Sequence, residues 1–85
     1  MAMPSEEILE RTDRLFQLWC DQRNARALRE LLRGYPLSSG LTDDWGGLLG
    51  ALEGVRAFAR DNLSDAEAHD VDELISAIGV LLSGH

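Results

Sequence analysis

The residues best suited to chemistry lie near the end of the chain, where one histidine is surrounded by acids. Asp65, His69, Asp72, Glu73 and Ser76 recur at spacings of three and four, which places them on one face of a helix. An imidazole flanked by carboxylates suits a divalent metal. A single histidine with acids is not a zinc or di-iron spacing, because paired Glu-x-x-His motifs are absent. We therefore expect a solvated acidic face, with no metal and no cofactor.

The other reactive side chains do not form a catalytic set. Cys20 is the single cysteine, and its place on an apolar stripe predicts a buried thiol, whereas a nucleophilic thiol needs exposure and a base. No serine, histidine and acid are spaced as in a triad. The segment 34–44 is rich in glycine and serine, but the chain has no lysine to complete a phosphate loop. We expect a protein that is not an enzyme.

A row of arginines forms the basic patch of the sequence. Arg23, Arg26, Arg29 and Arg33 recur about one helical turn apart. Guanidinium groups at this spacing suit phosphates or carboxylates. The row makes a poor nucleic-acid site, because no aromatic side chain is interleaved with it. The solvated face of an amphipathic helix explains the row most simply, and an acidic protein partner for Arg26, Arg29 and Arg33 is the alternative.

A line of glycines runs down one side of the middle of the chain. Gly46, Gly50 and Gly54 recur every fourth residue, Ala57 continues the line, and Phe58 flanks it. Each glycine inside a helix costs about 0.8–1 kcal/mol relative to alanine. A face of small residues lets a second backbone come close, as in small-xxx-small helix pairs. These five residues are therefore the predicted protein interface, and their partner is a helix of this chain, a second copy or another protein. The alternative is that the first glycines form a frayed, loop-like helix start and that the rest reflect a composition rich in glycine and alanine.

Charge is distributed unevenly along the 85 residues. The formal net charge of −7 comes from 8 arginines and 15 acids. Residues 1–41 hold six of each, so the whole deficit lies in residues 42–85, where nine acids face two arginines. Such a surface repels nucleic acid and anionic membranes, so we expect neither as a partner. It also suggests an acidic antagonist, immunity-like or antitoxin-like, that binds a basic protein through Asp65, Glu67, Asp70, Asp72 and Glu73.

Helical periodicity and start signals indicate the elements that position these residues. Apolar residues recur at spacings of three and four in three long segments and one short one. Ser5, Asn24 and Thr42 are predicted N-caps, and Ser64 and Glu67 form a capping box. The predicted helices cover about residues 5–23, 25–33, 43–62 and 65–82.

The short connections between these segments predict an all-α fold, a compact antiparallel bundle of three long helices and one short helix. The length is that of a single helical domain over residues 1–85. Its expected centre comprises Phe16, Trp19, Trp45, Leu52 and Ile75.

No secretory signal is apparent, and no apolar run is long enough to span a bilayer, so we expect a cytoplasmic protein. A core this small gains stability from association. We predict a non-enzymatic protein-interaction module, a homodimeric adaptor or regulator. The acidic antagonist is the alternative, and a metal or small-ligand binder is a third hypothesis.

Overall fold

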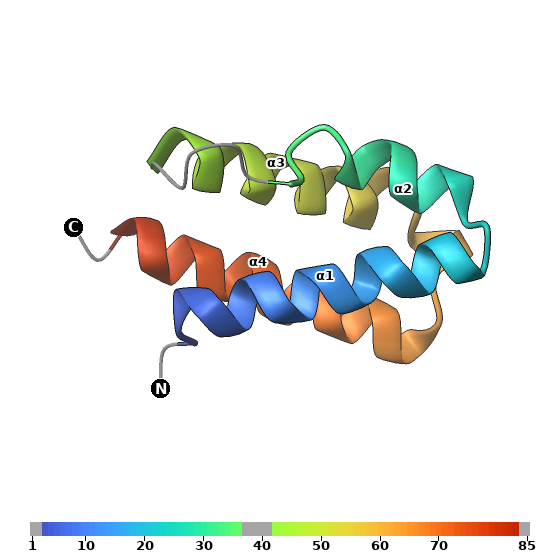
Figure 1. Cartoon of the computed structure of the whole chain (residues 1–85), viewed down its shortest axis with the longest axis horizontal. Coiled ribbons are helices and arrows are strands. Elements are labelled where there is room, and N and C mark those ends of the chain that lie inside the picture. The colour runs from blue at the N-terminus through green and yellow to red at the C-terminus, as the bar shows by residue number, and fades with distance from the viewer. Residues whose placement is uncertain (1–2, 37–41, 84–85) are drawn as a thin grey trace.

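The described residues, 3–36 and 42–83, form an antiparallel bundle in the computed structural model (Figure 1). Its elements are α1 (Ser5–Asp21), α2 (Ala25–Leu31), α3 (Thr42–Phe58), the 3-10 turn η1 (Arg60–Asn62) and α4 (Asp65–Ser83). Helices α1 and α3 each pack against both α2 and α4, and every packed pair runs antiparallel. The predicted fold, an all-α bundle of three long helices and one short one, is confirmed.

One hydrophobic core contains side chains from all four helices. Trp19, Trp45 and Leu52 are buried in it as predicted, whereas Phe16 and Ile75 lie partly exposed at its edge. Each of these two follows a buried leucine in the sequence, so it points about 100° away from that leucine around the helix. The buried core residues are Ile8, Leu15, Trp19, Ala27, Leu31, Trp45, Leu48, Leu52, Val55, Ala59, Val71, Leu74 and Ile78.

The caps predicted at Asn24 and Ser64 are confirmed, and the cap predicted at Ser5 is wrong. Asn24 Oδ1 and Ser64 Oγ each accept a hydrogen bond from the backbone N–H three residues later, at 3.3 and 3.1 Å. Of the predicted capping box only the serine half forms, because the Glu67 oxygens accept from the Ser64 hydroxyl and from Trp19.

Ser5 does not cap α1, because the helix already begins at this residue and extended Pro4 occupies the capping position. The Pro4 carbonyl accepts the first helical bond, from Ile8.

The central helix differs most from its prediction. It ends at Phe58, and the chain continues as the 3-10 turn Arg60–Asn62 rather than as the helix expected to about residue 62. Tertiary bonds explain this early end: Arg26 Nη1 donates to the Phe58 carbonyl at 3.2 Å, and Asn24 Nδ2 donates to the Asn62 carbonyl at 2.9 Å. The carbonyl of Phe58, the last residue of the helix, is thus satisfied from α2 instead of by another helical turn.

The first two helices each end two residues before their predicted ends. Helix α1 ends at Asp21, and the chain turns through Arg23, whose φ of 56° is left-handed. Helix α2 ends at Leu31 and is followed by a turn. The side chain of Thr42, predicted to cap α3, lies outside the described residues.

Candidate protein interface

The glycines of α3 divide between two sides of the helix, and α2 covers one of them. A Cβ on Gly54 would lie 2.9 Å from Oε1 of Glu30 on α2. A Cβ on Gly34, just after α2, would lie 2.1 Å from the carbonyl oxygen of Gly47. No side chain fits at Gly34, so the backbones of the two segments are in direct contact there. A Cβ on Gly47 itself would meet no atom of the described residues within 4 Å, so the contact at this residue involves only its backbone carbonyl. Gly54 and the carbonyl of Gly47 are termed the closed side of α3.

The contacts of the closed side follow an antiparallel register along α2 and α3. Arg26 bonds to the carbonyl of Phe58, Glu30 lies against Gly54, and Gly34 meets Gly47 at the other end. Of the predicted glycine line, Gly54 alone takes part in this close approach within the described chain.

The other small residues of the predicted interface form an open side, which comprises Gly46, Gly50 and Ala57. All three residues are exposed. A Cβ at Gly46 or Gly50 would have no atom of the described residues within 4 Å. Exposed Glu53 lies between Gly50 and Ala57 on the same stripe. The structure thus places three of the five predicted interface residues together and separates Gly54 from them.

The fifth predicted interface residue, Phe58, belongs to a different surface. Its ring is 64% exposed and borders a shallow pocket between α2 and α3. Arg26 and Arg29 line the same pocket. Arg33, predicted to share their surface, is not among its lining residues and instead lies with its Nε 3.6 Å from Glu30 Oε1.

One acid predicted to face a basic partner is instead inside the bundle. Glu67 is only 8% exposed, and Trp19 Nε1 donates to its Oε1 at 2.7 Å. The Ser64 hydroxyl donates to its other oxygen at 3.0 Å. Glu67 therefore joins the start of α4 to the end of α1, because a buried carboxylate needs such donors. Its expected role on the acidic surface was wrong.

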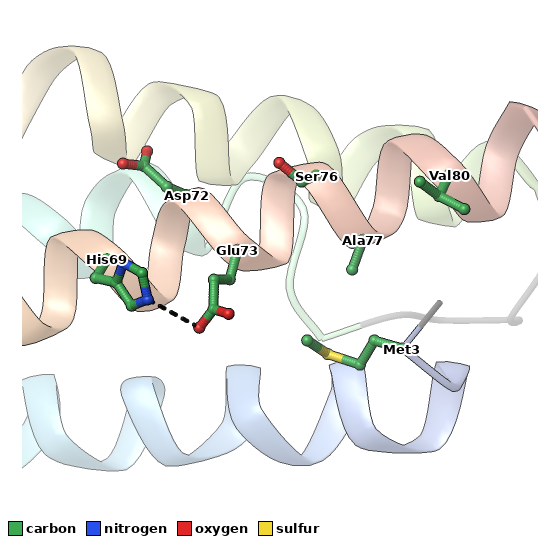
Figure 2. A pocket seen from close by; sticks show the side chains of 7 residues that line it. All are labelled: Met3, His69, Asp72, Glu73, Ser76, Ala77 and Val80. Carbon is green, nitrogen blue, oxygen red and sulfur yellow. Dashed lines mark ion pairs between the residues drawn. The ribbon is translucent and has the colours of Figure 1, made fainter. Parts of the chain in front are cut away.

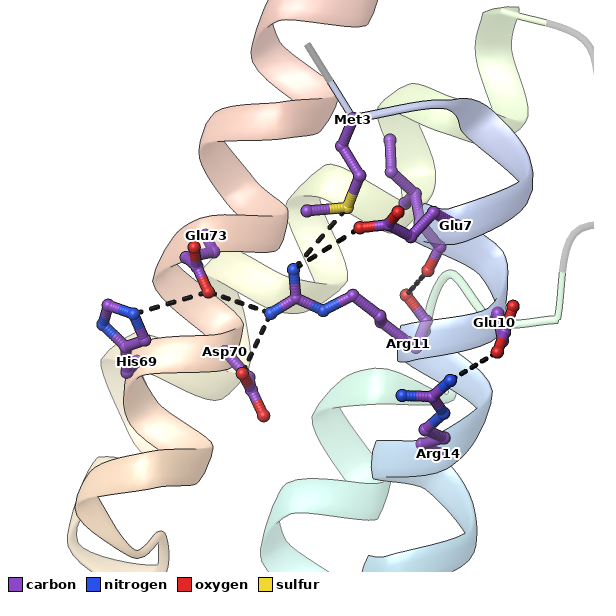
Figure 3. A network of polar contacts seen from close by, with 10 residues as sticks. Met3, Glu7, Glu10, Arg11, Arg14, His69, Asp70 and Glu73 are labelled. Carbon is purple, nitrogen blue, oxygen red and sulfur yellow. Dashed lines mark hydrogen bonds and ion pairs between the residues drawn. The ribbon is translucent and has the colours of Figure 1, made fainter. Parts of the chain in front are cut away.

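Three further acids of α4 form ion pairs with neighbouring helices, and Figure 3 shows the two that pair with Arg11. Arg11 Nη2 lies 2.9 Å from both Asp70 Oδ1 and Glu73 Oε1, and Arg56 Nη1 lies 3.7 Å from Asp72 Oδ1. The hydrogen bond from Arg11 lowers the pKa of Glu73, and the same bond is the main cause that raises the pKa of Arg11. Much of the acidic face thus has partners within the chain.

The predicted histidine cluster lies beside a shallow pocket of about 350 Å³ (Figure 2). His69, Asp72, Glu73 and Ser76 line it, and Asp65 does not. His69 Nε2 lies 3.4 Å from Glu73 Oε1. Within residues 3–36 and 42–83, no group of three or more His, Cys, Asp or Glu residues is arranged to hold a metal ion.

The prediction of a buried Cys20 was wrong, because this residue is exposed. It follows the fully buried Trp19 and so points about 100° away from the core.

Tyr35 holds the segment after α2 to α1. Its hydroxyl donates to Asp13 Oδ1 at 2.9 Å, and its ring centroid lies 5.5 Å from that of Phe16. Burial, followed by the bond to Asp13, raises the pKa of Tyr35 to about 12. These contacts help to keep α2 over the closed side of α3.

No protein-family model matches the chain, and no curated protein or solved structure shows significant similarity to it. Among the described helices, none combines the length and apolar character needed to cross a bilayer.

Proposed function

We propose that this protein is a non-enzymatic interaction module, an adaptor or regulator that pairs with a second copy through the open side of α3. The observation that supports it is the pair Gly46 and Gly50, which lie inside a helix with no described atom near their missing side chains. Together they cost about 1.6–2 kcal/mol relative to alanine. This cost is a large fraction of the free energy of unfolding of a small domain, and close packing of a second helix would offset the cost.

A two-fold dimer fits this surface because the same patch then serves both copies. From Gly46 to Ala57 the open side extends about 16 Å along the helix, about three turns. Glu53 favours an antiparallel pair. With a two-fold axis near Gly50, an antiparallel pair offsets the two Glu53 carboxylates in opposite directions along the helix, whereas a parallel pair would place them at the same height, side by side.

Light scattering across a range of protein concentrations tests the proposal on the wild type and on Gly50→Leu. Gly50 is exposed and a Cβ there has open space among the described residues, so the variant should fold. We expect a wild-type dimer and a Gly50→Leu monomer whose melting temperature is at least that of the wild-type monomer.

The matched control is Gln17→Leu, which adds the same side chain at an exposed position of α1. It should leave the dimer intact. A wild type that is monomeric at every concentration, or a dimer that survives Gly50→Leu, would contradict the proposal.

The acidic-antagonist alternative draws on the net charge of −7. It has weaker support, because Glu67 is buried and Asp70, Asp72 and Glu73 have arginine partners. It predicts a basic protein partner that is released at high salt.

The metal hypothesis predicts a rise in melting temperature on addition of a divalent metal such as zinc.

A further inference from the structure

The end of the bundle where α2 begins and α3 ends combines an exposed aromatic ring with two arginines. Phe58 has the largest exposed fraction of the large apolar side chains in the described residues. It borders a pocket of about 480 Å³ together with Ala25, Arg26, Arg29 and Glu30. These residues come from segments that are about 30 positions apart, so only the tertiary structure assembles them.

The positive charges of the two arginines in this pocket are not neutralised by carboxylates of the pocket. Arg29 makes no hydrogen bond or ion pair with any described residue, although acids outnumber arginines in the chain. Arg26 donates one bond to the Phe58 carbonyl, which leaves other guanidinium donors available. Glu30, the acid of the pocket, is 7% exposed and lies against Gly54 and Arg33. The pocket therefore presents positive charge on a protein that is otherwise acidic.

We propose that Arg26, Arg29 and Phe58 form a docking site for an acidic peptide segment of another protein. The carboxylates of the segment pair with the two guanidinium groups, whose planar forks match carboxylate geometry. An apolar side chain next to these carboxylates packs on the ring of Phe58. Aromatic residues and arginines in one pocket are the types that dominate binding energy at protein interfaces.

Charge complementarity selects a short acidic segment over nucleic acid. A peptide of a few residues meets mainly the positive pocket, whereas a long polyanion also meets the remaining surface of a protein with net charge −7. One aromatic ring also provides no platform for stacking successive bases.

This docking site is separate from the open side of α3. Phe58 follows Ala57 in the sequence and so points about 100° away from it around the helix. A monomer could bind the peptide as well as a dimer does, so failure of the proposed dimer and failure of this site give different results.

An NMR titration of the nitrogen-15-labelled protein tests the site. The probe is an acetylated and amidated peptide of four glutamates and two phenylalanines, and the control peptide has lysine in place of each glutamate. We expect saturable shifts of the backbone amides of Ala25, Arg26, Arg29 and Phe58 and of the side-chain Nε–H signal of Arg29. The shifts should weaken with added salt and be absent with the lysine peptide.

Two variants assign the binding to named side chains. Arg29→Gln should weaken binding about threefold to fivefold, as expected for one exposed ion pair. Phe58→Ala should weaken it about tenfold, since the ring supplies the apolar contact. Both residues are exposed, so both variants should fold.

Arg14→Gln is the matched control, because Arg14 pairs with Glu10 on α1 and lies away from the pocket. It should bind as the wild type does. No shifts at millimolar peptide, shifts centred elsewhere, or unchanged affinity in both variants would overturn the proposal. Tighter binding of a single-stranded oligonucleotide at the same residues would also overturn it.

Discussion

The closed and open sides of α3 carry the same type of residue and have opposite surroundings. On the closed side, Gly54 lies under Glu30, and the backbone of Gly47 touches Gly34. On the open side, Gly46 and Gly50 meet no atom of the described residues. A glycine in a helix thus allows a second helix to pack closely, but the close packing occurs only where a neighbouring helix lies over that glycine.

Three glycine positions differ in how strongly the surrounding atoms exclude a side chain. At Gly34 the obstacle to a side chain is a backbone oxygen at 2.1 Å, which cannot move without shifting α2 or α3. At Gly54 it is the end of a flexible carboxylate at 2.9 Å, and at Gly50 there is none. Substitutions at these three positions should therefore rank in that order.

The largest effect is expected for Gly34→Ala. Its methyl group would overlap the backbone of Gly47, so α2 must move away from α3, at a cost of about 2–4 kcal/mol of unfolding free energy. Chemical denaturation measures this cost. A loss below about 1 kcal/mol would show that the contact is looser than the structure indicates.

A smaller loss is expected for Gly54→Leu. The leucine displaces Glu30 and strains the packing of α2, for an expected cost of about 1–3 kcal/mol. Gly54→Ala is the comparison, because movement of the carboxylate and the gain in helix propensity nearly offset each other. Equal stabilities of the leucine and alanine variants would argue that α2 does not cover this position.

The opposite sign is expected on the open side. Gly50→Ala should stabilise the monomer by about 0.8–1 kcal/mol, because alanine gains helix propensity and meets no described atom. Denaturation at a concentration where light scattering finds only monomer measures this gain. A destabilised variant would show that the open side is covered within the chain.

The last prediction concerns Tyr35, which helps to keep α2 in place over the closed side and affects stability only at high pH. Its pKa is raised from 10.0 to about 12, so the folded state holds the phenolic proton more tightly than the unfolded state does. This contribution is complete below pH 10 and is lost as the pH rises from 10 to about 12. Tyr35→Phe should remove that loss of stability.

The chain makes this measurement simple, because Tyr35 is its single tyrosine and it has no lysine. Ultraviolet absorbance of the tyrosinate reports the titration directly, and circular dichroism reports the fold. Ionisation near pH 10 in the folded protein would contradict the hydrogen bond to Asp13 and the partial burial of the ring.

Much of the fold was predictable because its signals are local. The caps at Asn24 and Ser64 act within three residues, and the apolar spacing identifies the buried face of each helix. The candidate interface was less predictable. The sequence pointed to Gly46, Gly50 and Gly54 as one line, and it did not predict the contact between Gly34 and Gly47.

The sequence by itself determined the four helices and the antiparallel bundle, since periodicity, caps and short connections suffice for these. The tertiary structure alone decided which glycines are covered, because that depends on how α2 lies across α3. It also determined that Glu67 is buried, because its hydrogen bond to Trp19 joins residues 48 positions apart. Contacts of this kind depend on helix position and tilt, which local sequence patterns do not encode.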